Sequence, residues 1–351
     1  MKIKITTKKE VSNFCEPYII AEIGSNHNGD MALAKELIQK AKEAGADCVK
    51  FQSWSKETIF SKKVYDDNYF LKDDYRNRTD YTLEGIVEAF SISENELLEM
   101  KKIADEVGID VSSTPFSHKE VDFLIDKLES PFIKIASMDL NNYPFLKYVA
   151  KKKRPIIIST GLSTLSEIDK AISVIEGEGN NEIVILHCIS IYPPKDEQVN
   201  LNNIDTLQKL YPYPIGFSDH TIGTSIPLAS VAKGACIIEK HFTLDKSMFG
   251  WDHKVSADAA ELKVICEDSR RISKALGTTR IVSLEDEDRK NAFRRSVVAA
   301  NDIPEGAVIQ ETDLDYKRPG SGLSPEVSRF IIGKKAKRKI SKDEIIKFED
   351  F

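Results

Sequence analysis

Two lysines interrupt strongly apolar stretches of this chain. Lys50 lies in the run VKF and Lys134 in the run IKI. A buried ammonium group without an anionic partner is unfavourable, so each lysine must meet either a carboxylate of the protein or a bound anion. Two such lysines indicate a ligand with several negative charges, and ion pairs with Glu22 or Glu239 are the alternative.

Two histidines close the last two apolar runs, His220 in FSDHT and His241 in IEKHF. With the carboxylates of Glu22 and Asp252 nearby, they would form a mixed nitrogen and oxygen site of the kind that suits Mn, Zn, Fe or Co ions. A single histidine is more often a core residue, but two at neighbouring strand ends favour a metal. We therefore expect a divalent metal on His220 and His241.

Hydroxyl side chains follow several other apolar runs, namely Thr114, Ser137, Ser159 and Ser218. They can donate hydrogen bonds to the oxygens of a phosphate group. If all the runs end at one place, lysines, hydroxyls and imidazoles would share a single site.

The pattern that would bring them together is a repeat of strands and helices. From Tyr18 to about residue 275, eight apolar runs alternate with segments of helical period, such as Met31–Ala44 and 164–175. Eight such units predict a TIM (β/α)8 barrel, whose active sites lie at the carboxyl ends of the strands. The competing doubly wound sheet would carry a glycine fingerprint before its first helix, and none is present. A long insertion, 53–90, follows the second run.

The C-terminal part of the chain has a different pattern. We predict a barrel domain over residues 1–280, a linker over 281–292, and a small, mostly β domain over 293–351 with the strand-like pieces SVVAA, AVIQ and IIKF. The basic cluster 334–339 lacks interleaved aromatic residues, so a solvated surface is favoured over a nucleic-acid site.

Composition limits the class of protein. The 351 residues are 41% hydrophobic and 30% charged, with a net charge of -6, which provides no general attraction for nucleic acid. The sequence has no membrane span or signal-peptide stretch, so a cytoplasmic location is expected. The five cysteines are far apart and lie mostly in apolar runs, which indicates reduced core thiols.

The same segments resemble the N-acetylneuraminate (sialic acid) synthase family over nearly the whole chain. The shared motifs are AEIGSNHNGD, VKFQ, STPF, KIAS, STGLST, LHCISIYP, GFSDHT, EKHFTLD and DHKVS. The tail, with FRRSVVA, IPEG and KRPGSG, resembles the family's antifreeze-like (SAF) domain. Several long motifs in one order form a specific signal.

The resemblance implies an enzyme that condenses phosphoenolpyruvate with an N-acetylmannosamine-like aldehyde and releases phosphate. It implies a divalent metal on His220 and His241, with Mn²⁺ as first choice and Mg²⁺ or Co²⁺ as alternatives, and proton transfer by Glu22 or Asp252. The substrate-binding residues would be Lys50, Gln52, Thr114, Phe116, Lys134, Ser137, Asp139, Ser159, Ser190, Tyr192 and Ser218. It also implies a domain-swapped homodimer in which Arg318 reaches the partner's sugar.

Departures from the family pattern bear on the sugar. Met138 and Asp139 stand where the family usually has Gly and Glu, Ser190 replaces Asn, and Trp251 replaces Pro. The acceptor is then either N-acetylmannosamine or a diacetamido trideoxy hexose, as used for legionaminic or pseudaminic acid. Another phosphoenolpyruvate-dependent synthase with a phosphorylated sugar is a further alternative, for which Arg76 and Arg78 could supply charge. A carbohydrate-binding protein would not need so many functional groups at strand ends.

Overall fold

The computed structural model describes residues 1–68, 82–281 and 283–351. Within them the chain forms two compact units, Met1–Gly277 and Thr278–Phe351. Arg76 and Arg78, named above for a second phosphate, lie outside the described residues. Among the described helices, none has the length and apolar character needed to cross a membrane.

The larger unit is built on eight parallel strands in the order β5-β4-β3-β10-β9-β8-β7-β6. Their bounds are β3 Tyr18–Gly24, β4 Cys48–Gln52, β5 Asp110–Thr114, β6 Ile133–Ile135, β7 Ile156–Ser159, β8 Ile183–Cys188, β9 Ile215–Asp219 and β10 Ile237–His241. The two outermost strands, β5 and β6, contact each other, and Ser112 on β5 donates a hydrogen bond to the carbonyl of Phe132 beside β6. The sheet therefore closes, and the predicted barrel is confirmed.

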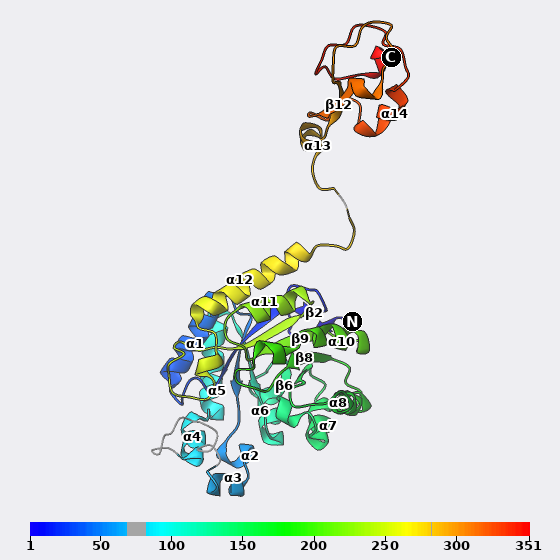
Figure 1. The fold of residues 1–351 in the computed structure, drawn as a ribbon. Helices are drawn as coiled ribbons and strands as arrows, with labels where there is room; N and C mark the ends of the chain where they lie inside the picture. The colour runs from blue at the N-terminus through cyan, green and yellow to red at the C-terminus, as the bar shows by residue number, and fades with distance from the viewer. Residues whose placement is uncertain (69–81, 282) are drawn as a thin grey trace. The chain divides into compact units, whose positions relative to one another are not determined.

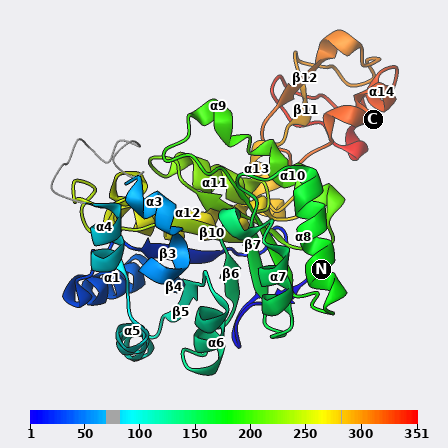
Figure 2. The same ribbon diagram turned by 90° about the horizontal axis from the view of Figure 1, so that it is seen from below.

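Helices cover the outside of the strands (Figures 1 and 2). They are α1 Met31–Ala44, α5 Glu94–Val107, α6 His118–Asp126, α7 Tyr143–Ala150, α8 Leu165–Gly177, α10 Asn202–Leu210, α11 Ser225–Ala232 and α12 Ala259–Leu276, with the short α9 Asp196–Val199 after β8. α1 begins where Asp30 accepts the backbone N–H groups of Ala32 and Leu33, and it ends at Gly45 in a left-handed conformation. Its apolar face is buried, so the helix packs against the barrel.

The N-terminal end of the barrel is closed by a small hairpin, β1 Ile3–Lys4 with β2 Glu10–Val11. Ile3, Ile5 and Val11 pack there with the buried Tyr18 at the start of β3. This end is filled by apolar side chains, so functional groups must gather at the opposite, carboxyl end.

The insertion after β4 folds over one side of that carboxyl end. It contains α2 Lys56–Ile59, α3 Lys62–Asp66 and α4 Leu83–Phe90. Trp54 and the buried face of α4 form a separate apolar cluster that Trp251, from the loop after β10, joins. The insertion therefore adds aromatic surface beside the strand ends.

The smaller unit has its own core around Val297, Ile309 and Ile340. It contains α13 Glu287–Phe293, β11 Ser296–Ala299, β12 Leu314–Lys317 and α14 Ser328–Ile331, with β11 and β12 antiparallel. The pieces AVIQ and IIKF, expected as strands, make only isolated bridges, at Val308 and Ile345. Much of the segment predicted as a linker, 281–292, is occupied by α13.

Single-turn 3-10 helices occur in both units. They lie at Ser137–Asp139 and His253–Val255 in the larger unit, and at Glu311–Asp313, Pro325–Val327 and Phe348–Asp350 in the smaller one.

Candidate active site

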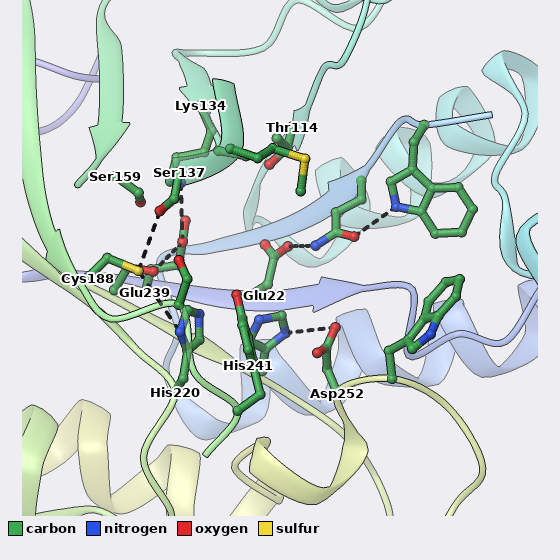
Figure 3. A pocket seen from close by; sticks show the side chains of 18 of the residues that line it. Glu22, Thr114, Lys134, Ser137, Ser159, Cys188, His220, Glu239, His241 and Asp252 are labelled. Atoms are coloured by element: carbon green, nitrogen blue, oxygen red, sulfur yellow. Dashed lines mark hydrogen bonds and ion pairs between the residues drawn. The ribbon is translucent and has the colours of Figure 1, made fainter. Parts of the chain in front are cut away.

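A cavity of about 840 Å³ opens at the carboxyl ends of the barrel strands (Figure 3). Most of the predicted site residues line it: Glu22, Lys50, Gln52, Thr114, Phe116, Lys134, Ser137, Ser159, Ser190, Tyr192, Ser218, His220, His241 and Asp252. This volume accommodates a ligand of drug size or smaller. Two predicted residues are not in the lining: Asp139 accepts a hydrogen bond from Asn142, and Arg318 lies in the smaller unit over the ring of Phe293.

Parallel pairing places the functional groups at one level. Glu22 on β3 is the Cα partner of both Lys50 on β4 and His241 on β10. Glu239, two positions before His241, is paired with Ser218 on β9. Because alternate residues of a strand point the same way, Glu239 and His241 both face the cavity.

The two predicted lysines make ion pairs inside the barrel. Lys50 Nζ lies 2.6 Å from Glu22 Oε2 and 3.6 Å from Glu239 Oε2, and it donates a hydrogen bond to Thr114 Oγ1 at 2.7 Å. Lys134 Nζ lies 3.6 Å from Glu239 Oε1. Ion pairing, the alternative considered from the sequence, is therefore present, yet both lysines also line the cavity, where an anion could reach them.

The pKa values of the two carboxylates in this network, Glu22 and Glu239, are shifted in opposite directions. Burial raises the pKa of Glu22 to about 7, against the attraction of Lys50 and with a further contribution from the negative charge of Glu239. Burial also opposes the charge of Glu239, but Lys134 and Lys50 outweigh it and hold its pKa at about 2. Glu239 is therefore a fixed negative charge, while Glu22 can exchange a proton near neutral pH.

Three hydroxyls lie on another side of the cavity, close to Gly161. A Cβ atom added to Gly161 would lie 2.2 Å from Ser190 Oγ and 2.7 Å from Ser137 Oγ. Only glycine lets both hydroxyls approach the backbone this closely. The nearby strand β7 contributes Ser159, whose buried Oγ has no hydrogen-bond partner among the described residues. Ser137 Oγ donates to Cys188 Sγ, whereas the unpartnered Ser159 hydroxyl is available to an oxygen of an anion.

His220 and His241 lie on the neighbouring strand ends, with ring centroids 5.5 Å apart. His220 Nδ1 lies 2.7 Å from the carbonyl of Ile189 and donates to it, which leaves Nε2 for another partner. Burial opposes protonation of His220, but Cys188 and the Ile189 carbonyl outweigh it and raise its pKa. Burial and the neighbouring His220 hold the pKa of His241 well below its usual range.

These imidazoles fit a divalent metal. Imidazole nitrogens bind such ions at about 2.1 Å, so one ion can reach both rings. His241 Nδ1 is buried without a hydrogen-bond partner in the described part of the chain, and Asp252 Oδ2 lies 3.8 Å from it. Within residues 1–68, 82–281 and 283–351 there is no cluster of three or more His, Cys, Asp or Glu arranged to hold a metal, so the two histidines would need further ligands from solvent or substrate.

One wall of the cavity is aromatic. The rings of Trp54 and Trp251 meet edge to face at 5.6 Å. Trp54 Nε1 donates to Gln52 Oε1, and Gln52 Nε2 donates to Glu22 Oε1 at 3.1 Å (Figure 3). This chain of hydrogen bonds ties the aromatic wall to the carboxylate whose pKa is near 7. Met138 also lines the cavity and is more than half exposed.

Some lining residues were missing from the predicted site. Glu239 is absent from the predicted site, although it stands with His241 at the end of the last strand, in the motif EKH. Trp54 lies in the insertion, where no strand pattern applies. Lys254, exposed at the cavity, directly follows the DH pair of DHKVS.

Two protein-family models match this chain. The model of the NeuB family matches residues 37–280, and that of the SAF domain matches residues 294–351. The N,N'-diacetyllegionaminic acid synthase of Campylobacter jejuni is 40% identical over 94% of this chain and 98% of the relative. The human N-acetylneuraminate-9-phosphate synthase is 36% identical over 94% of this chain and 91% of the relative. The solved N-acetylneuraminic acid synthetase of Leptospira borgpetersenii, crystallised with citrate, has a TM-score of 0.71 at 31% identity and covers 83% of this chain and 95% of its own.

Proposed function

The chain belongs to the NeuB family of phosphoenolpyruvate-dependent condensing enzymes and carries a C-terminal SAF domain. From this premise we propose that it joins phosphoenolpyruvate to an amino-sugar aldehyde to form a nonulosonic acid. The observation that carries the proposal is the meeting of Lys50 and Lys134 with His220 and His241 in one cavity. An anion site beside two imidazoles is what this condensation requires.

Phosphoenolpyruvate brings a phosphate and a carboxylate, and the cavity offers donors for both. The ammonium groups of Lys50 and Lys134 are buried, where charge-assisted hydrogen bonds are strong. The hydroxyls that complete the proposed anion site are Thr114, Ser137, Ser159, Ser190 and Ser218. Glu22 and Glu239 hold the two ammonium groups in place, so the anion would join an existing network of ion pairs.

The second part of the proposed site is the metal, with Mn²⁺ as first choice and Mg²⁺ or Co²⁺ as alternatives. His220 and His241 would hold it, and when bound it would act as a Lewis acid toward the aldehyde oxygen. Asp252, 3.8 Å from His241 Nδ1, would orient that imidazole or the sugar beside it.

The reaction then needs a proton carrier. C3 of phosphoenolpyruvate forms a bond to the aldehyde carbon, and the aldehyde oxygen takes up a proton to become a hydroxyl. A water oxygen adds to C2, and phosphate leaves as its C2–O bond breaks, which produces a keto group. The added water must lose a proton near neutral pH. Glu22, whose pKa lies at about 7, is placed on β3 between the paired lysine and histidine strands to accept it.

For the acceptor, we propose an N-acyl amino sugar without a phosphate group, with a diacetamido trideoxy hexose preferred to N-acetylmannosamine. Trp54, Trp251 and Met138 give the cavity an apolar wall that suits methyl and acyl groups. In the described lining, the lysines are Lys50, Lys134 and Lys254, and the first two are already assigned to phosphoenolpyruvate. A sugar phosphate would therefore depend on Lys254 there.

Rates of phosphate release test the acceptor directly. We expect kcat/KM to be highest with a 2,4-diacetamido-2,4,6-trideoxy hexose and lowest with N-acetylmannosamine 6-phosphate. Met138→Gly, which removes apolar surface from the wall, should shift the preference toward N-acetylmannosamine. Highest activity with the 6-phosphate, lost in Lys254→Met, would contradict the proposed acceptor.

We also propose a homodimer in which the smaller unit of one protomer serves the partner's cavity. Apolar side chains that follow strands β6 to β9 are exposed on the barrel unit: Met138, Leu162, Ile191 and Ile222. Exposed apolar residues around a cavity favour coverage by another protein surface. Arg318, exposed on the smaller unit, is the side chain expected to reach the sugar.

A further inference from the structure

Asp219 and Lys240 form an ion pair that the proposed chemistry leaves unused. Lys240 Nζ lies 2.7 Å from Asp219 Oδ2, and neither side chain is exposed to solvent. The two residues are Cα partners on β9 and β10. Each one directly precedes a predicted metal ligand, because Asp219 is followed by His220 and Lys240 by His241.

The pair also fixes the turn that leaves β9. Asp219 Oδ1 accepts the backbone N–H of Thr221 at 2.9 Å, and Lys240 donates to the backbone carbonyl of the same residue. His220 lies between Asp219 and Thr221, so the backbone on both sides of this imidazole is connected to β10. The ring itself is held separately, through Nδ1 and the carbonyl of Ile189.

Stability alone does not explain this arrangement. Neither residue lines the cavity, so the pair has no access to substrate. Moving two charges out of water costs several kcal/mol each, and apolar side chains of similar volume often stabilise a core as well or better. What apolar residues would not supply is a directional link between the end of β9 and the end of β10.

We propose that Asp219 and Lys240 are positioning residues that set the spacing of the His220 and His241 imidazoles, so that one divalent cation binds both. The inference rests on the metal site proposed above and deepens it. It predicts that metal affinity depends on this pair even when the stability of the fold does not.

The test is Mn²⁺ binding to chelator-stripped protein, followed by electron paramagnetic resonance of the free ion, alongside thermal unfolding. The double variant Asp219→Asn with Lys240→Met keeps an acceptor for the Thr221 N–H and fills the lysine's volume without a buried charge. We expect its unfolding temperature to stay near that of the wild type, while the Kd for Mn²⁺ rises about tenfold or more. An unchanged Kd would overturn the proposal.

Two further variants guard against an indirect effect. Tyr18→Phe removes the hydrogen bond from Tyr18 to Asp110 Oδ2 at the opposite end of the barrel. It should lower stability and leave the Kd for Mn²⁺ unchanged, so a raised Kd there would attribute the effect to stability and overturn the proposal. If the double variant does not fold, Asp219→Glu is measured instead, which keeps both charges and lengthens the link between β9 and β10, with the same rise or constancy of Kd deciding. A wild type that does not bind Mn²⁺ would contradict the metal site as well, whereas binding that is equal in wild type and variant contradicts only this inference.

Discussion

Glu239 and Lys134 form an ion pair of 3.6 Å in the lining of the cavity, where neither side chain exposes more than 8% of its surface. Glu239 also accepts a hydrogen bond from Ser218 and lies 3.6 Å from Lys50. One carboxylate therefore links both lysines that we propose to bind phosphoenolpyruvate, and its replacement should disturb both.

Glu239→Gln should raise the KM for phosphoenolpyruvate about tenfold, because the lysines lose the charged acceptor that holds them. Steady-state phosphate release measures this. Glu43→Gln, which removes the charge of an exposed ion pair with Lys40, is the control and should have no effect. A lower KM in Glu239→Gln would mean that Glu239 only competes with the anion for the lysines.

Gly161→Ala should weaken phosphoenolpyruvate binding about fivefold by pushing the hydroxyls of Ser137 and Ser190 out of their positions. The change is expected in the KM for phosphoenolpyruvate and not in the unfolding temperature. Gly177→Ala is a matched control, since a Cβ there meets no atom within 4 Å. Equal KM values in both variants would argue against an anion site at Gly161.

The buried His27 should make stability depend on pH. Burial lowers the pKa of His27 to about 4, whereas an unfolded chain titrates near 6.5. The unfolded state therefore binds the proton first, and stability is lost as the pH falls from about 6.5 to 4, by about 3 kcal/mol. His27→Gln keeps a possible acceptor for the Gly29 N–H without titrating. Urea unfolding at each pH measures the free energy of unfolding, which should fall less between pH 6.5 and 4 in this variant than in the wild type. The same dependence on pH in both proteins would refute the assignment to His27.

The proposed swapped dimer predicts complementation between inactive variants. His220→Ala should destroy the proposed metal site of its own protomer. Arg318→Ala should remove the side chain that we propose reaches the partner's cavity. In a mixed dimer one cavity then has both residues. Co-refolded equal amounts should recover about a quarter of wild-type activity, because half of the dimers are mixed and each has one intact site. No recovery would contradict the swap.

The alternation of apolar runs and helical segments in the sequence predicted much of the fold. β3 and α1 have the predicted bounds, since β3 is a continuous apolar run and α1 is delimited by Asp30 and Gly45. The C-terminal pieces AVIQ and IIKF formed single bridges, because short alternating segments do not reveal their pairing partners.

The lining of the cavity was predictable for side chains that stand at strand ends. Lys50, Lys134, His220 and His241 follow from the barrel rule, which places strand ends together. Glu239 was left out of the predicted site because the sequence does not show its contacts with lysines from two other strands. Asp139 was expected in the lining but accepts a hydrogen bond from Asn142, the residue that caps α7, and this local backbone geometry could not be read from the sequence.

The most direct test of the proposed function is a stoichiometric assay with phosphoenolpyruvate, Mn²⁺ and a diacetamido trideoxy hexose. We predict one phosphate released per keto-sugar acid formed, no release after chelation, recovery on adding Mn²⁺, and no recovery in His220→Ala. Phosphate release that persists in His220→Ala, or none from the wild type with any amino sugar, would contradict the assignment of this cavity to the condensation.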